Sequence, residues 1–157
     1  LTGLLNRRSL MQWGAKLVEQ SAASGTPLGL VILDLDHFKE INDTFGHKTG
    51  DEVLRCVAQC LQNGLRHGDV LGRYGGDEFV AFLPGVDFNG AMQIAERLRT
   101  LIYTCRISGQ LSPITLSASC GVFVSQAGQT TCVDDLLRQA DLALYRAKGG
   151  GRNQAAA

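Results

Sequence analysis

The chain has 157 residues, 45% of them hydrophobic, and its 15 basic side chains balance 15 acidic ones. This length and composition predict one globular domain with its own hydrophobic core. The zero net charge argues against a nucleic-acid partner, which normally requires a basic excess. The longest apolar run, Leu28 to Leu33, is too short to cross a bilayer, so we expect no direct membrane contact.

Apolar periodicity and turn residues predict the elements of the first half of the chain. We expect a helix, a buried strand, a short helix and a loop, over residues 6–23, 28–35, 38–45 and 46–50. Asn6 is the expected cap of the first helix. Its buried stripe is expected to be Leu10, Trp13, Leu17 and Val18.

The second half is predicted to contain a helix, a hairpin, a second helix, a strand and a last helix. Their expected ranges are 51–65, 70–74 with 78–83, 90–103, 114–124 (with a kink at Gly121) and 133–147. Helices and strands therefore interleave, yet one strand pair is a plain hairpin. This mixture predicts an α+β fold with a mainly antiparallel sheet and helices packed against it.

The five cysteines are Cys56, Cys60, Cys105, Cys120 and Cys132. Cys56 and Cys60 lie four apart on an expected helix, a spacing that would also allow the two thiols to bind one metal ion. They share a face with apolar residues, so we interpret them as small buried hydrophobes. Free thiols fit a reducing cytoplasm.

Residues 73–79 read Arg-Tyr-Gly-Gly-Asp-Glu-Phe, the expected tip of the hairpin. We expect Gly75 and Gly76 to take positive φ in a tight turn and to leave bare backbone that a polyphosphate can approach. Asp77 and Glu78 then place two carboxylates beside that turn. A solvated hairpin with ordinary turn residues is the alternative interpretation.

Asp34 and Asp36 close the apolar strand at 28–35, where an unpaired carboxylate would be costly. Asp34, the carbonyl of Leu35 and Asp77 from the hairpin predict an oxygen-rich Mg²⁺ site. We assign Asp36 the structural role of a loop acid paired with Lys or Arg, on the ground that side chains alternate along a strand. The alternative is that both acids are loop residues paired with Lys or Arg.

Four segments, in this order, carry a resemblance to a known family. They are residues 1–8, the stretch from Asp34 to Asp51, the hairpin tip at 73–79, and residues 140–153. Together they resemble the GGDEF family, the diguanylate cyclases. The resemblance implies a nucleotidyl-cyclase palm: a ferredoxin-like, mainly antiparallel sheet with surrounding helices and an extra β-hairpin. It also implies that residues 1–157 are a single catalytic domain cut from a longer protein, without its N-terminal regulatory region.

The resemblance implies an enzyme that joins two GTP molecules into cyclic di-GMP and releases two pyrophosphates. Two Mg²⁺ ions per site are expected, with Mn²⁺ as a substitute, and a homodimer is expected to be the active unit in the bacterial cytoplasm. A module that binds GTP or cyclic di-GMP without turnover is the alternative. A cyclase with a different dinucleotide product is disfavoured because Asp51 is acidic.

Residue roles also follow from the resemblance. Glu78 would be a further metal ligand or a base, and the base is left open between Asp77, Glu78 and water. Phosphates would be held by the backbone at Phe38 and Lys39 and by Lys148 and Arg152, although the last two also suit a helix end. Guanine would be read by Asn42 and Asp51, of which Asp51 also suits a helix cap.

Arg66 and Asp69 have the spacing of the family's inhibitory product site. A surface ion pair of little energetic value is the alternative for two such residues. Arginine binds phosphate and guanine edges in bidentate fashion and aspartate accepts from guanine, so we favour the product site. Arg97 is a weaker candidate for its second half. His37, His47 and His67 are treated as structural.

Overall fold

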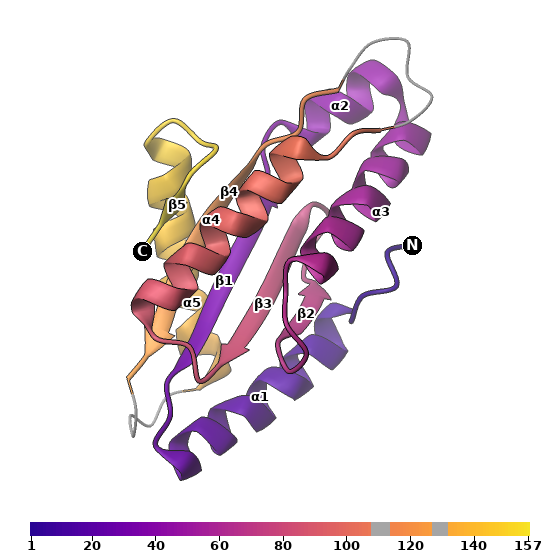
Figure 1. Ribbon diagram of the computed structural model, residues 1–157. Coiled ribbons are helices and arrows are strands. Elements are labelled where there is room, and N and C mark those ends of the chain that lie inside the picture. Colours follow the sequence, from indigo (N-terminus) through magenta and orange to yellow (C-terminus); the bar gives the residue numbers. More distant parts are fainter. Residues whose placement is uncertain (108–113, 127–131) are drawn as a thin grey trace.

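The computed structural model describes residues 1–107, 114–126 and 132–157 (Figure 1). The elements in chain order are α1 Arg7–Ser24, β1 Leu28–Leu35, α2 Phe38–Phe45, α3 His47–Asn63, β2 Val70–Arg73, β3 Glu78–Pro84, α4 Phe88–Thr104, β4 Ala118–Ser125, α5 Val133–Gly149 and β5 Ala155–Ala156. Within these ranges, no helix combines the length and apolar character that a membrane span requires.

The described strands form one sheet in the order β2-β3-β1-β4-β5. β1 lies in the middle and pairs antiparallel with both β3 and β4, so that Leu30 is flanked by Phe82 and Phe123. Only the β4–β5 pair is parallel. The predicted α+β fold with a mainly antiparallel sheet is confirmed, whereas the short β5 at residues 155–156 was not predicted.

The sheet is covered by helices on both faces, and strand alternation decides which side chains meet which helices (Figure 1). Val31 and Leu33 of β1 belong to the core cluster that includes α3 and α4. Leu30 and Ile32 belong to the second cluster, with α1 and α5. Asp34 continues the Leu30–Ile32 alternation, which directs it toward the α5 side.

Several predicted boundaries hold because capping and apolar signals were strong. β1 has the predicted range, and Asn6 caps α1 by accepting a hydrogen bond from the backbone N–H of Ser9 at 2.9 Å. The predicted strand at 114–124 is wrong at its start, since β4 begins at Ala118. Trp13 was also wrongly placed in the buried stripe of α1. It is 47% exposed, and Gly14 instead lies against the ring of Phe82.

The predicted loop at 46–50 is wrong, because α3 starts at His47 and Gly46 alone separates it from α2. Gly46 takes a φ of 83°, which a residue with a side chain rarely adopts. Gly50 lies inside α3, where a Cβ would come within 3.0 Å of Cγ of Asn42. Glycine is therefore used at position 50 for close contact between two helices, rather than for a loop.

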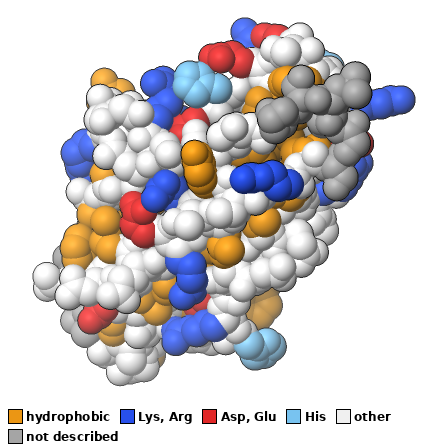
Figure 2. Space-filling view, turned by 45° about the horizontal axis from the view of Figure 1, so that its top comes forward, with side chains coloured by type: hydrophobic (Ala, Val, Ile, Leu, Met, Phe, Trp, Pro, Cys, Tyr) orange, Lys and Arg blue, Asp and Glu red, His pale blue; other side chains and the backbone are white. Residues whose placement is uncertain are grey.

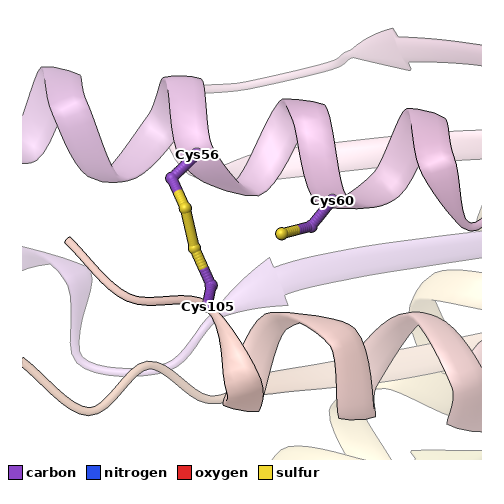
Figure 3. A group of neighbouring side chains, drawn as sticks. All are labelled: Cys56, Cys60 and Cys105. Carbon is purple, nitrogen blue, oxygen red and sulfur yellow. A yellow bond between two sulfur atoms is a disulfide. The ribbon is translucent and has the colours of Figure 1, made fainter. Parts of the chain in front are cut away.

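The cysteine prediction is wrong for two of the five residues. Cys56 on α3 and Cys105 at the end of α4 form a disulfide, with Cα atoms 6.9 Å apart (Figure 3). Cys60 and Cys120 are thiols. Cys56 and Cys60 are only partly buried and pack against the edge of the core. Residues 49 positions apart in sequence were brought together by the packing of α3 beside α4.

The contact of α5 with β4 at Gly121 yields a test of the packing. A Cβ at Gly121 would lie 2.8 Å from Cβ of Leu144 and would also strike backbone atoms of Ala140 and Leu144. Because backbone cannot rotate away, Gly121→Ala is expected to lower the free energy of unfolding by about 1–3 kcal/mol. Urea unfolding measures this. The control Gly149→Ala, at the end of α5 with nothing within 4 Å of an added Cβ, should be neutral or slightly stabilising. Equal stability of Gly121→Ala and wild type would contradict the packing.

Candidate active site

A hollow of about 290 Å³ lies where β1 ends. The turn between β2 and β3 closes one side of it, because the backbone N–H of Leu35 donates to the carbonyl of Asp77 at 3.3 Å. Asp34 and Asp77, from separate parts of the chain, therefore converge on the same hollow. Its lining residues are Asp34, Leu35, Asp36, His37, Phe38, Lys39, Asp77, Lys148 and Arg152.

Asp34 is held by an ion pair with the last turn of α5. Nζ of Lys148 lies 2.9 Å from Oδ2 of Asp34, whose side chain is only 13% exposed. Burial raises the pKa of Asp34 above its ordinary value, Lys148 opposes that rise, and the negative charges of Asp77 and Asp36 add to it. The pKa of Asp34 thus stays raised mainly because the carboxyl is buried, although Lys148 opposes the rise.

Glu78 lies opposite Asp34 in the β1–β3 register. Burial raises the pKa of Glu78, and the charges of Asp34 and Asp77 raise it further. Its side chain lines a second hollow of about 400 Å³ on the α5 side of the sheet. Asp77 and Glu78 thus line different hollows, although the charges of Asp34 and Asp77 still raise the pKa of Glu78.

Three polar residues of α5 that sequence reasoning missed line the second hollow beside Glu78. They are Asp134, Arg138 and Asp141. Asp141 also contributes to the raised pKa of Glu78. The signal was present in the sequence, because Asp134, Arg138 and Asp141 recur at helical spacing and therefore share one face of the helix.

Asp36 has a different environment. It is 6% exposed and accepts hydrogen bonds from the hydroxyls of Ser117 and Ser119 and from the backbone N–H of Asn153. The role is structural, as we predicted, but the partners are two hydroxyls and a backbone N–H where we expected Lys or Arg. Alternation was also the wrong reason, since residues two apart share a face. The two acids differ because β1 ends at Leu35. Asp36 then fastens the segment after α5 to the sheet.

The start of α2 forms another wall of the first hollow, to which Phe38 and Lys39 contribute. His37 precedes the helix in the left-handed conformation, with a φ of 58°, and its Nδ1 lies 2.7 Å from Oε1 of Glu40. Lys148 and Arg152 line the same hollow. The four residues predicted to hold phosphates therefore lie around one space, with His37 as a member that the sequence reasoning had assigned no partner.

The two glycines of the hairpin turn differ from the prediction. Neither Gly75 nor Gly76 is among the residues with positive φ. Gly75 instead leaves room for the side chain of Glu78, which an added Cβ would strike. Gly76 has nothing within 4 Å of such a Cβ, and its carbonyl accepts from the guanidinium of Arg73, with Nη2 at 2.6 Å. The turn is thus shaped by close approach and by Arg73.

Asn42 and Asp51 lie away from the lining of the first hollow, at the contact between α2 and α3. The side chain of Asn42 lies against Gly50, the residue before Asp51, and a Cβ at Gly50 would also lie 3.4 Å from Cζ of Phe38. Asp51 is exposed and lies in the second turn of α3, so it is not the helix cap, which is Gly46. Phe38 connects this region to the hollow.

Arg66 and Asp69 form an ion pair, with Nε 3.2 Å from Oδ1. The Asp69 side chain is fully buried and also accepts from the backbone N–H of Arg66, while Arg66 is 59% exposed and donates to the carbonyl of Pro84. Arg97 donates to the carbonyl of Gly64 at 2.6 Å. Asp69 therefore orients Arg66, and its own carboxylate is not accessible to a ligand. Arg97 is bonded to Gly64, the residue that caps the C-terminal end of α3.

The first hollow has the donor set that Mg²⁺ prefers, namely carboxylate and carbonyl oxygens. Burial is the largest cause of the raised pKa of Asp34 and of Glu78, and repulsion from nearby carboxylates adds to it in each case. A divalent cation would relieve that repulsion, so the residues present fit the ion.

Figure 2 shows acidic and basic side chains interspersed over one face of the molecule, in agreement with zero net charge.

A palm-like antiparallel sheet, with acids of its central strand and of a glycine turn meeting at one end, defines a nucleotidyl-cyclase type of domain. The sequence matches the family described as "Diguanylate cyclase, GGDEF domain" over residues 1–154. The chain belongs to this family.

Curated relatives are similar over nearly the whole chain. Diguanylate cyclase DgcP of Pseudomonas aeruginosa is 39% identical over 98% of the chain and 23% of its own length. Response regulator PleD of Caulobacter vibrioides is 40% identical over 98% of the chain and 34% of its own length. The chain thus spans about a quarter to a third of these proteins.

Solved structures show the same fold. The GGDEF domain of DgcB from Caulobacter crescentus, in complex with c-di-GMP, has a TM-score of 0.92 at 30% identity, covering 99% of this chain and 91% of that one. The active GGEEF domain of a diguanylate cyclase from Vibrio cholerae has a TM-score of 0.89 at 33% identity, covering 98% and 96%.

The raised pKa of Glu78 predicts a pH-dependent stability difference. With a raised pKa the folded chain keeps this proton to higher pH than the unfolded chain, so the contribution of Glu78 to stability falls as pH rises above about 4.5, its ordinary value. Glu78→Gln removes this loss. Without divalent ions, the variant should gain stability relative to wild type as pH rises from about 4.5 to above the raised pKa of the folded chain.

Urea unfolding at a series of pH values measures the difference. The matched control is Glu52→Gln, an exposed acid on α3. A stability difference between Glu78→Gln and wild type that stays constant across the window would contradict the electrostatics described here.

Proposed function

We propose that this domain condenses two GTP molecules into cyclic di-GMP with release of two pyrophosphates, as a Mg²⁺-dependent diguanylate cyclase. The observation that carries the proposal is the convergence of Asp34 and Asp77 on one hollow that Lys148, Arg152 and the start of α2 also line. Carboxylates for a metal and cations for phosphates are thereby combined in one space. Since the chain spans only part of its relatives, the proposal concerns the domain alone.

The phosphates of GTP are proposed to occupy the first hollow. Backbone N–H groups at Phe38 and Lys39 point outward at the helix start, where anions are stabilised. Lys148 and Arg152 add positive charge from the opposite wall. When substrate binds, Lys148 exchanges its contact with Asp34 for a phosphate oxygen, which frees the carboxylate for a cation.

Guanine is proposed to lie at the α2–α3 contact, next to Asn42 and Asp51. The carboxylate of Asp51 accepts from N1–H and N2–H₂ of guanine, whereas adenine offers an acceptor at N1 and no such amine. A mismatched polar group costs on the order of 1–3 kcal/mol, so GTP should be favoured over ATP by roughly 5- to 150-fold.

Asp34, the carbonyl of Leu35 and Asp77 are proposed to hold two metal ions in the first hollow, and Glu78, which lines the second hollow, is proposed to reach them as a further ligand. When bound, Mg²⁺ stabilises charge on the attacking oxygen and on the departing pyrophosphate, a role that Mn²⁺ can also fill. The residues of the chain orient the α-phosphate for attack by a 3′-hydroxyl. The proton leaves that hydroxyl to Asp77, Glu78 or water, among which Glu78 has the raised pKa that suits a base.

One domain holds one GTP, and the reaction joins two. We therefore propose a twofold symmetric homodimer in which the first hollow of one chain faces the first hollow of the other. The 3′-hydroxyl of each GTP then meets the α-phosphate of the other GTP. The rate of cyclic di-GMP formation per chain should rise with protein concentration.

The substrate GTP and the bacterial relatives support a cytoplasmic location.

The proposed activity is tested with purified protein, GTP and Mg²⁺ at high protein concentration. Cyclic di-GMP is the expected product by chromatography, and Asp77→Asn is expected to lower its rate at least about 100-fold, by analogy with the loss of other electrostatic groups. Glu19→Gln, an exposed acid on α1, is the control and should leave the rate unchanged. A folded wild-type protein that binds GTP but makes no product at any concentration would favour the non-catalytic binding module.

We also propose that cyclic di-GMP inhibits the domain by binding at Arg66, with Arg97 as a second contact. The pairing with buried Asp69 holds the guanidinium of Arg66 in place, and its exposed part is available to a phosphate or guanine edge. Asp69 is thereby assigned to orienting Arg66, although direct acceptance from guanine was expected from the sequence.

Arg66→Ala is expected to raise the concentration of cyclic di-GMP needed for half inhibition by at least about tenfold, as the loss of a charged hydrogen bond would. Initial rates at increasing product concentration measure this. Arg55→Ala, an exposed arginine on α3, is the control. Unchanged inhibition of the Arg66 variant would remove this assignment.

A further inference from the structure

Three cysteines outside the active site lie close together. Sγ atoms of Cys56, Cys60 and Cys105 are all within 4.8 Å of one another. Cys56 and Cys60 lie one turn apart on α3, and Cys105 follows the end of α4 (Figure 3). None of these residues takes part in the proposed nucleotide chemistry.

The structure holds two of the three sulfurs in a disulfide, Cys56–Cys105, with the Cys60 thiol beside them. Reduction of that bond would leave three thiols in a triangle. A phosphine does this by giving two electrons to the S–S bond and taking an oxygen atom from water, whose two protons go to the sulfurs. The products are two thiols and a phosphine oxide.

We propose that, in the reduced chain, Cys56, Cys60 and Cys105 form a binding site for one thiophilic metal ion. Thiolates select soft or borderline cations such as Cu⁺ and Zn²⁺ over Mg²⁺. The site is therefore chemically separate from the oxygen-lined hollow at β1.

The distances suit such an ion. With metal–sulfur bonds of about 2.3 Å, sulfurs of a tetrahedral site lie roughly 3.8 Å apart. In the reduced chain, side-chain rotations of Cys56 and Cys105 would separate the two sulfurs that the disulfide now joins, while Sγ of Cys60 already lies within 4.8 Å of both. The carbonyl oxygen of Arg106, 4.0 Å from Sγ of Cys56, lies near enough to support a fourth position, which water also can fill.

The surroundings also favour an ion over three solvated thiols. Cys105 is 5% exposed, and Cys60 and Cys56 are partly buried against the core. The guanidinium of Arg106 donates to the backbone carbonyl of Cys105 at 3.1 Å, which helps to hold the chain at the end of α4 in place. Binding would fasten α3 to the end of α4, as the disulfide does in the oxidised chain.

The test uses the whole chain, reduced with a phosphine and freed of reagent without oxygen. Cd²⁺, as a spectroscopic substitute for Zn²⁺, is titrated while the ultraviolet thiolate-to-metal band is followed, and Cu⁺ is titrated in competition with a chromogenic chelator. We expect one ion per chain in at least one titration. Binding of Cd²⁺ would indicate a four-coordinate site, and binding of Cu⁺ alone a trigonal one.

Cys60→Ser removes one ligand without touching the disulfide partners, and it is expected to weaken binding by at least about tenfold, the lower end of the loss seen when only a supporting residue is removed. Cys56→Ser is a second variant with the same expectation. Cys132→Ser, an exposed cysteine before α5, is the control and should bind as wild type does. The oxidised chain should bind no ion at this site.

Absence of binding by the reduced wild type in both titrations would overturn the proposal. Equal affinity of Cys60→Ser and wild type would overturn it as well, because two thiols would then suffice.

Discussion

The pairing of Lys148 with Asp34 is the interaction on which the candidate site depends. It joins the last turn of α5 to the end of the central strand, at a contact of 2.9 Å, within a cluster of acids that would otherwise repel one another. Burial is the main cause of the raised pKa of Asp34 and of Glu78, and repulsion from neighbouring carboxylates adds to it. We propose that the carboxylates at this end of the sheet hold a divalent ion and, through it, a triphosphate.

The fold serves that cluster by bringing distant segments to one end of β1. The antiparallel pairing with β3 sets Glu78 opposite Asp34 and brings Asp77 to the carboxyl end of the strand. Close packing of α5 at Gly121 positions the last turn of that helix, and the hydrogen bonds of Asp36 fasten the chain that follows it. The packing of α5 on the sheet therefore also fixes the position of the charges, since α5 cannot shift without moving Lys148.

Sequence patterns predicted the features that depend on local signals. The apolar run that became β1, the cap at Asn6 and the identity of the acids at the hairpin were all visible in the residues alone. Tertiary contact decided what was missed. Gly50 resembles a loop residue until Asn42 is seen against it, and Gly75 resembles a positive-φ turn residue until the side chain of Glu78 is seen beside it. The Cys56–Cys105 bond likewise depends on packing between separate elements. The two-residue β5 has too few side chains to show a period.

The most direct measurement is a crystal structure with a non-hydrolysable GTP analogue and Mn²⁺, with the metal located by its anomalous scattering. The account predicts an anomalous peak within coordination distance of the carboxylates of both Asp34 and Asp77, with Lys148 turned from Asp34 to the phosphates. A peak bound by neither carboxylate, or a triphosphate seated away from the first hollow, would contradict it.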